Sequence, residues 1–204
     1  MIREAELEVD NSCILGQGSF RVVVEGRFCC GPVAIKLLQT SQLDESRIAA
    51  FNELRILRHI RHPNIVHFYG ACFCSTSTDV KIVMEKVLGA NLHTWLAAQK
   101  PPTLHVLQGR AFIMQRLCHA LVYLHSREPR VVHADLKPHY VMIQMLDSVP
   151  HPKLLDFGLS GLVTRTAVLK GGTLEYMAPE VLYIYIYMCV YIYIYIYIYI
   201  YIYI

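Results

Sequence analysis

Two short stretches, HADLKP at residues 133–138 and DFG at residues 156–158, decide how the rest of this sequence is interpreted. In the first stretch, Asp135 can accept the proton of an incoming hydroxyl, and Lys137 can neutralise a phosphoryl group during its transfer. In the second, Asp156 offers a carboxylate of the kind that binds magnesium. Each stretch alone also fits a loop acid or a turn, so the interpretation depends on the residues that precede them.

Glycines, a lysine and a glutamate precede these stretches at informative places. Gly16 and Gly18 lie between two predicted strands, where missing side chains let backbone N–H groups approach a phosphate chain. Taken alone, the two glycines fit a tight hairpin turn better than a phosphate-binding loop, because Arg21 stands where a third glycine would complete the phosphate-binding motif. Lys36 lies on a predicted third strand and Glu53 on the helix expected next, and a lysine held by a carboxylate can bind the phosphates of a nucleotide. The alternative for Lys36 is an ordinary exposed strand lysine.

The spacing of the apolar residues separates a β-rich first part from a helical second part. Residues 7–39 are β-prone and punctuated by glycines, which predicts two hairpin-linked strands and a third in a small antiparallel sheet. Residues 48–60 have helical spacing, with Glu53 on the same face as the apolar side chains. The further elements expected are strands at 65–73, 80–87, 131–132, 141–143 and 154–155, and helices at 91–98 and around 113–124.

In this order and at these spacings, the features above, together with APE at residues 178–180, resemble the eukaryotic protein kinases. The resemblance covers residues 7–182 and implies an α+β, two-lobed fold, with a small antiparallel β-sheet lobe and an incomplete helical lobe. The first lobe is expected at about residues 7–86, the hinge at 85–89 and the partial helical lobe at 90–182. Ligands are expected in the cleft between the lobes.

The resemblance also implies an activity and a site. The expected reaction is transfer of the γ-phosphate of ATP to serine or threonine hydroxyls of proteins, with Mg2+ as the metal; tyrosine specificity is the weaker alternative. Met84 is expected as the gatekeeper behind the adenine, whose edge would bind the backbone of residues 85–87. The nucleotide residues implied are Gly16, Gly18, Val23, Ala34, Lys36, Met84, Glu85, Val87 and Met142. Those implied for catalysis are Asp135, Lys137, Lys36 and Glu53, with Asp156 for the metal.

Besides Arg21, two further positions depart from the family pattern. Tyr140 stands where the family has an asparagine that helps to hold a second magnesium ion, and a neutral phenol is a poor magnesium ligand. Ala134 replaces the arginine that binds a phosphorylated activation loop in many relatives. From Tyr140 we expect impaired phosphoryl transfer, and from Ala134 we expect weakened regulation by loop phosphorylation. A pseudokinase or a nucleotide-binding scaffold is an open alternative.

Residues 183–204 are an almost pure alternation of Tyr and Ile. We interpret this run as a translated TA repeat, because the codons TAT and ATA encode these two residues. A membrane span and a β-strand are the alternatives, and a tyrosine at every second position argues against the span. In the family, several helices follow the APE stretch and none is expected here, so a truncated product without function is a further alternative. Loss of those helices would leave the apolar face of the helix around 113–124 uncovered.

Composition limits the partners. A net charge of +3 over 204 residues argues against nucleic acid and against an anionic membrane as partners. The 7 cysteines, including the adjacent Cys29 and Cys30, lack the spacing of a zinc site and are expected to be reduced. With no apolar segment suited to a secretory signal near the amino terminus, a reducing cytoplasmic or nuclear setting is expected.

Overall fold

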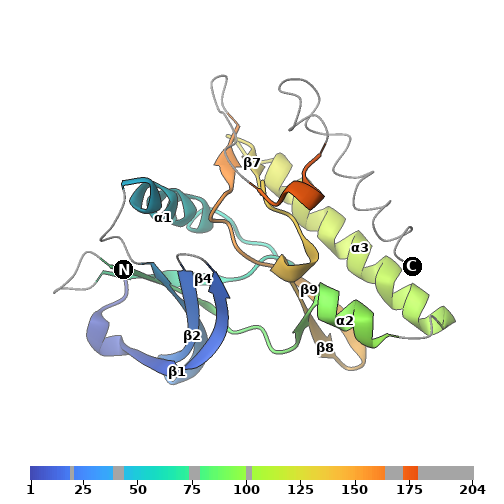
Figure 1. The fold of residues 1–204 in the computed structure, drawn as a ribbon, viewed down its shortest axis with the longest axis horizontal. Helices are drawn as coiled ribbons and strands as arrows, with labels where there is room; N and C mark the ends of the chain where they lie inside the picture. The colour runs from blue at the N-terminus through green and yellow to red at the C-terminus, as the bar shows by residue number, and fades with distance from the viewer. Residues whose placement is uncertain (19–20, 39–43, 74–78, 100–102, 164–171, 179–204) are drawn as a thin grey trace.

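The computed structural model of this chain describes residues 1–18, 21–38, 44–73, 79–99, 103–163 and 172–178 (Figure 1). The last two residues of the APE stretch and the Tyr–Ile run lie outside these ranges. Within them, no helix combines the length and the apolar character needed to span a membrane.

The first half of the chain forms a five-stranded antiparallel sheet in the order β1-β2-β3-β5-β4. Its strands are β1 (Leu7–Gly18), β2 (Arg21–Phe28), β3 (Gly31–Leu38), β4 (Phe68–Phe73) and β5 (Val80–Glu85). The predicted antiparallel sheet is confirmed. Gly26 in β2 is required by packing, because a Cβ at this position would collide with the Ile35 side chain and with the carbonyl oxygen of Glu8.

The edge strand β4 is covered on its outer side by the first residues of the chain. The backbone N–H of Ile2 donates to the carbonyl oxygen of Ala71 at 2.9 Å. The Ile2 side chain is buried against Gly70, where a Cβ would lie 2.9 Å from Cγ1 of Ile2. A short 3-10 turn, η1 (Glu4–Glu6), then leads into β1.

Helix α1 (Asp44–Leu57) follows the third strand and packs against the sheet. The buried residues of its last turns are Glu53, Ile56 and Leu57, as the apolar spacing predicted. The helix begins and ends earlier than the predicted span of 48–60. Ile60 is nevertheless buried, because the turn after the helix carries it into the same core.

The second half of the chain contains helices and short strands. Its elements are β6 (Ala90–Asn91), α2 (Leu92–Ala98), α3 (Leu104–His125), β7 (Val131–Val132), η2 (Pro138–Tyr140), β8 (Val141–Leu146), β9 (Val149–Leu154), β10 (Gly161–Leu162) and η3 (Leu174–Tyr176). Side-chain caps fix both helix starts: Asn91 accepts from the N–H of Thr94, and Thr103 accepts from the N–H of Val106. The strands form two small sheets, β6-β8-β9 and β10-β7. Both predicted helices and the strands expected at 131–132 and 141–143 are present, so the β-rich and helical halves are confirmed. The strand expected at 154–155 is displaced, because β9 ends at Leu154.

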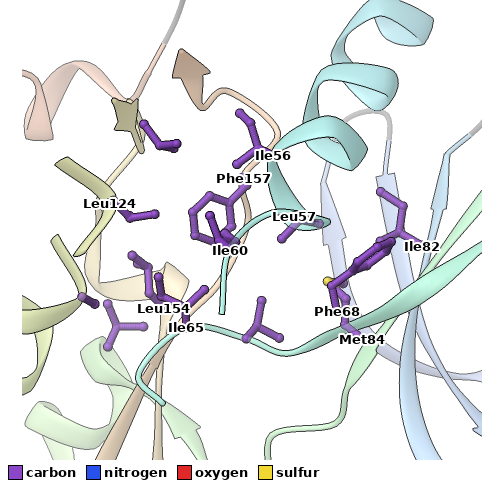
Figure 2. Packing of buried hydrophobic residues seen from close by; sticks show 14 of the residues in the cluster. Ile56, Leu57, Ile60, Ile65, Phe68, Ile82, Met84, Leu124, Leu154 and Phe157 are labelled. Carbon is purple, nitrogen blue, oxygen red and sulfur yellow. The ribbon is translucent and has the colours of Figure 1, made fainter. Parts of the chain in front are cut away.

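One hydrophobic core joins the two halves (Figure 2). Phe157 lies at its centre and is fully buried, with Leu124 of α3 on one side and Leu57 of α1 on the other. The apolar face of α3 around residues 113–124 is buried, since β7 and β9 pack against this helix. The expectation of an uncovered face is therefore wrong, because it did not count these two strands as cover.

Candidate active site

Lys36 on β3 lies between two carboxylates that come from distant parts of the chain. Its ammonium donates to Oε1 and Oε2 of Glu53 on α1 at 2.6 and 2.9 Å, and to Oδ1 of Asp156 at 2.6 Å. The side chains of Lys36 and Glu53 are only 4% and 1% exposed, whereas that of Asp156 is 18% exposed. The predicted pairing of Lys36 with Glu53 is observed, and it fixes the ammonium beside the expected metal ligand.

The DFG loop places Asp156 through an unusual backbone conformation. Asp156 has a φ of +56°, in the left-handed region that costs most residues about 1–2 kcal/mol. Its Oδ1 accepts from the N–H of Gly158 at 3.2 Å. Full burial of Phe157 anchors the loop and offsets the backbone cost.

His133 connects the HADLKP and DFG stretches. Its Nε2–H donates to the carbonyl oxygen of Leu155 at 2.8 Å, and its ring lies edge-on to Phe157 at 5.0 Å between centroids. Burial lowers the pKa of His133, because a charged imidazole would have to give up its hydration. The two stretches are therefore held together by a neutral histidine.

Ser160 and Asn52 strengthen this connection, and sequence reasoning missed both. The Ser160 hydroxyl donates to the carbonyl oxygen of His133 at 3.0 Å. The Asn52 side-chain amide donates to the carbonyl oxygen of Ser160 at 2.6 Å, which ties α1 to the loop after DFG. Both residues are short polar side chains near recognised motifs, and the sequence carries no signal that would single them out.

Asp135 is held by Thr173, a third residue whose contact with the site the sequence did not predict. Oδ1 of Asp135 accepts from the Thr173 N–H at 2.9 Å and from the Thr173 hydroxyl at 2.7 Å. The Lys137 ammonium donates to the same hydroxyl oxygen at 2.7 Å and lies 3.2 Å from Oδ2 of Asp135. Thr173 thus orients the predicted proton acceptor and the predicted phosphoryl-neutralising lysine together.

Gly172 explains how Thr173 can come so close to Asp135. Its φ is +131°, and a Cβ there would lie 2.9 Å from the carbonyl oxygen of Ala134. Only glycine combines that backbone conformation with this close approach. The glycine pair before Thr173 was the available signal, and it predicts a tight backbone approach without indicating its target.

The residues expected around the nucleotide lie on β1, β2, β3, β5 and β8 and on the segment after β5. They are Gly16, Gly18, Val23, Ala34, Met84, Glu85, Val87 and Met142. Ala34 lies beside Met84 in the register of the sheet. The N–H of Glu85 already donates to the carbonyl oxygen of His67 at 2.9 Å, so it belongs to the local backbone pairing. A Cβ at Gly16 would meet nothing within 4 Å, so packing does not explain this glycine. Contact of these residues with a nucleotide stays a prediction.

The comparison with known proteins agrees with this geometry. A family model described as "Protein kinase domain" matches residues 9–189. The chain belongs to the protein kinase family. This confirms the resemblance inferred from the motifs.

Three curated relatives of this kinase domain illustrate the range of similarity. It is 32% identical over 189 residues to serine/threonine-protein kinase VIK of Arabidopsis thaliana, which covers 88% of this chain and 42% of the relative. It is 34% identical over 191 residues to dual specificity protein kinase shkC of Dictyostelium discoideum, and the alignment covers 89% of this chain and 35% of the relative. It is 33% identical over 178 residues to mitogen-activated protein kinase kinase kinase 7 of Bos taurus, and the alignment covers 86% of this chain and 29% of the relative. The chain therefore spans less than half the length of these relatives.

Tyr140, the residue that stands in place of the family's asparagine, lies beside Lys137 in the kinase site. It ends η2, and the Lys137 ammonium lies 4.3 Å from the centroid of its ring. An ammonium over a tyrosine face is attracted by the negative face of the ring. In this kinase domain, Tyr140 therefore contacts the lysine that also bonds to Thr173.

Proposed function

We propose that this kinase domain transfers the γ-phosphate of ATP to serine or threonine hydroxyls of a protein. The observation that carries the proposal is the Lys36 ammonium, bound at once to Glu53 and to Asp156. This arrangement supports the proposal, because it brings together the lysine that we propose for phosphate binding and the carboxylate that we propose for metal binding. Asp135 would accept the hydroxyl proton, and Lys137 would neutralise charge on the transferred group.

The donor chemistry of the site fits one magnesium ion bound through Asp156. The described residues hold no cluster of three or more His, Cys, Asp or Glu side chains suited to a metal. Mg2+ in kinases needs no such cluster, because one or two carboxylates and the substrate phosphates supply its ligands together with water. When bound, the ion would neutralise the charge of the phosphates. Tyr140 offers no good second ligand, so we propose that one ion is bound through the protein.

The orientation of Asp135 supports catalysis. Its Oδ1 carries two hydrogen bonds from Thr173, which fix the plane of the carboxylate. A proton acceptor that is held in one orientation needs little reorganisation when the substrate arrives. Serine or threonine as the acceptor agrees with the name of VIK, a serine/threonine-protein kinase, whereas shkC is called dual specificity.

Calorimetric titration with MgATP tests the nucleotide site. Lys36→Met should weaken binding by roughly tenfold to a hundredfold, because a charge-assisted hydrogen bond contributes about 1.5–3 kcal/mol. Lys81→Met is the matched control, since Lys81 is a lysine of the same sheet that pairs with Glu4 instead. Equal affinity of the Lys36→Met and Lys81→Met variants would overturn the assignment of Lys36.

Transfer is tested separately with γ-labelled ATP and a mixed serine/threonine peptide library. Asp135→Asn should abolish labelling while leaving MgATP affinity within about twofold, because Asp135 acts on the hydroxyl and not on the nucleotide. Binding of MgATP without any labelling by the unmodified chain would instead favour the nucleotide-binding scaffold, which the departures from the family pattern at Tyr140 and Arg21 support.

A further inference from the structure

Cys29 and Cys30 form the complete turn between β2 and β3. Phe28 and Gly31, the residues on either side, are paired across the hairpin. Both cysteines are exposed and both thiols are free. The Arg27 guanidinium donates to the carbonyl oxygen of Cys30 at 3.0 Å, which holds the turn in place.

Neither packing nor turn preference explains two cysteines here. Their φ angles are +47° and +64°, so both adopt the left-handed conformation. A two-residue hairpin turn with positive φ at both positions favours asparagine and glycine, and other residues are strained in it. Exposed side chains gain little burial energy in return.

The backbone geometry favours a bridge over a direct disulfide. The peptide bond between these residues is trans, which holds their Cα atoms about 3.8 Å apart. Disulfides usually span about 4.4–6.8 Å between Cα atoms, so a bond between the two sulfurs would be strained. An atom that takes one bond from each sulfur separates them and avoids this strain.

We propose that Cys29 and Cys30 form a vicinal dithiol site that chelates a thiophilic centre, of the class of trivalent arsenicals, through both sulfurs. Thiolates are soft ligands and select soft partners. Once one sulfur is bound, the second bond forms within the molecule at high effective concentration. In the reaction with phenylarsine oxide, two As–S bonds form and the As–O bond breaks. The oxygen leaves as water with the two thiol protons, and the arsenic stays trivalent.

The other described cysteines are less suited to this chemistry. The Cys13 thiol donates to Oε2 of Glu25 at 3.3 Å, and this hydrogen bond raises the pKa of Cys13. Cys72 is fully buried. Cys118 is half-buried on α3. Adjacency and exposure are combined only at Cys29 and Cys30 within the described part of the chain.

The dithiol site is separate from the proposed nucleotide site. Strand β2 has 8 residues, which at about 3.3 Å each place this turn roughly 25 Å from the glycine-bearing end of the hairpin. Binding at Cys29 and Cys30 can therefore be tested independently of kinase activity.

The test uses the reduced full chain, one equivalent of phenylarsine oxide and intact-mass spectrometry. We expect one adduct that survives excess monothiol and is removed by a 1,2-dithiol. Subsequent alkylation and peptide mapping should find both Cys29 and Cys30 protected. Cys29→Ala and Cys30→Ala should each lower the affinity by at least about a hundredfold, the scale of a lost second attachment. Cys13→Ala, the matched control, should leave it unchanged.

The double variant Cys29→Asn with Cys30→Gly separates binding from folding. It supplies the residues that this turn prefers, so its unfolding midpoint should equal or exceed that of the unmodified chain while the adduct is lost. An adduct retained by either single variant, mapped to Cys72 or Cys74, or formed equally by the Asn-Gly variant would overturn the proposal.

Discussion

Replacing Lys36 with methionine should destabilise the domain strongly. The ammonium is shared by Glu53, which is 1% exposed, and Asp156, which is 18% exposed. Removing it leaves the Glu53 carboxylate buried without a cation, a situation that costs about 3–5 kcal/mol. Asp156 adds little to the cost, because water can reach its carboxylate. For a domain of this size, such a loss lowers the Tm by about 6–20 °C.

Urea unfolding followed by circular dichroism measures the effect. The double variant Lys36→Met with Glu53→Gln should be more stable than Lys36→Met alone, because the buried negative charge is then gone as well. Lys81→Met should cost no more than about 1 kcal/mol, since Lys81 and Glu4 form a partly exposed pair. The reasoning fails if Lys36→Met lies within about 0.5 kcal/mol of the unmodified protein, a change typical of surface substitutions.

Three further predictions concern the loops around Asp135. Tyr140→Leu should lower the rate of peptide phosphorylation roughly fivefold, because the contact with Lys137 contributes about 1 kcal/mol. Tyr140→Phe should keep the rate and Tyr140→Asn should raise it by supplying an amide oxygen for the metal; equal rates for the Leu and Phe variants would refute the contact. Below pH 6.5, which is about the unperturbed pKa of histidine, His133 binds a proton in the unfolded state but stays neutral in the folded state, where burial lowers its pKa. The free energy of unfolding should therefore fall by up to about 1.4 kcal/mol for each unit by which the pH is lowered. In urea titrations His133→Gln should show a shallower pH dependence, and an unchanged slope would contradict the assignment. Thr173→Val should lower kcat and leave the KM for ATP unchanged, since Thr173 bonds to Asp135 and Lys137; a change confined to KM would argue for a different role.

The sequence predicted the elements of the fold better than their ends. The strand expected from residue 65 begins at Phe68, because Ile65 bridges to Leu154 and the N–H of Val66 donates to Leu154. These residues pair with β9 rather than with the large sheet. Only tertiary contact reveals this, since the apolar run itself is continuous.

The hairpin of β8 and β9 is longer than predicted for a related reason. Pro150 and Pro152 lie inside β9, and prolines argue against a strand. Because β9 is an edge strand of the β6-β8-β9 sheet, it tolerates residues that cannot donate to a second neighbour. The position of a strand within its sheet is not visible in its own sequence.

For the site, the motifs predicted which side chains come together, and the structure adds what holds them. The pairing of Lys36 with Glu53 could be predicted, because strand and helix placement put them on facing elements. The bonds from Thr173 to Asp135 could not, since the two residues lie on separate loops that meet only in the folded chain. Loop closure depends on the whole fold, whereas a motif reports only local spacing.

The pairing of Ile2 with the edge strand β4 has a practical consequence for handling the protein. An exposed edge strand offers unpaired N–H and C=O groups to another molecule and is a template for aggregation. Ile2 occupies part of that edge on β4 through its bond to Ala71 and its burial against Gly70. A purification tag removed by a protease that also cuts after Arg3 would open this edge. Preparations trimmed in this way should self-associate more readily than those that retain Ile2.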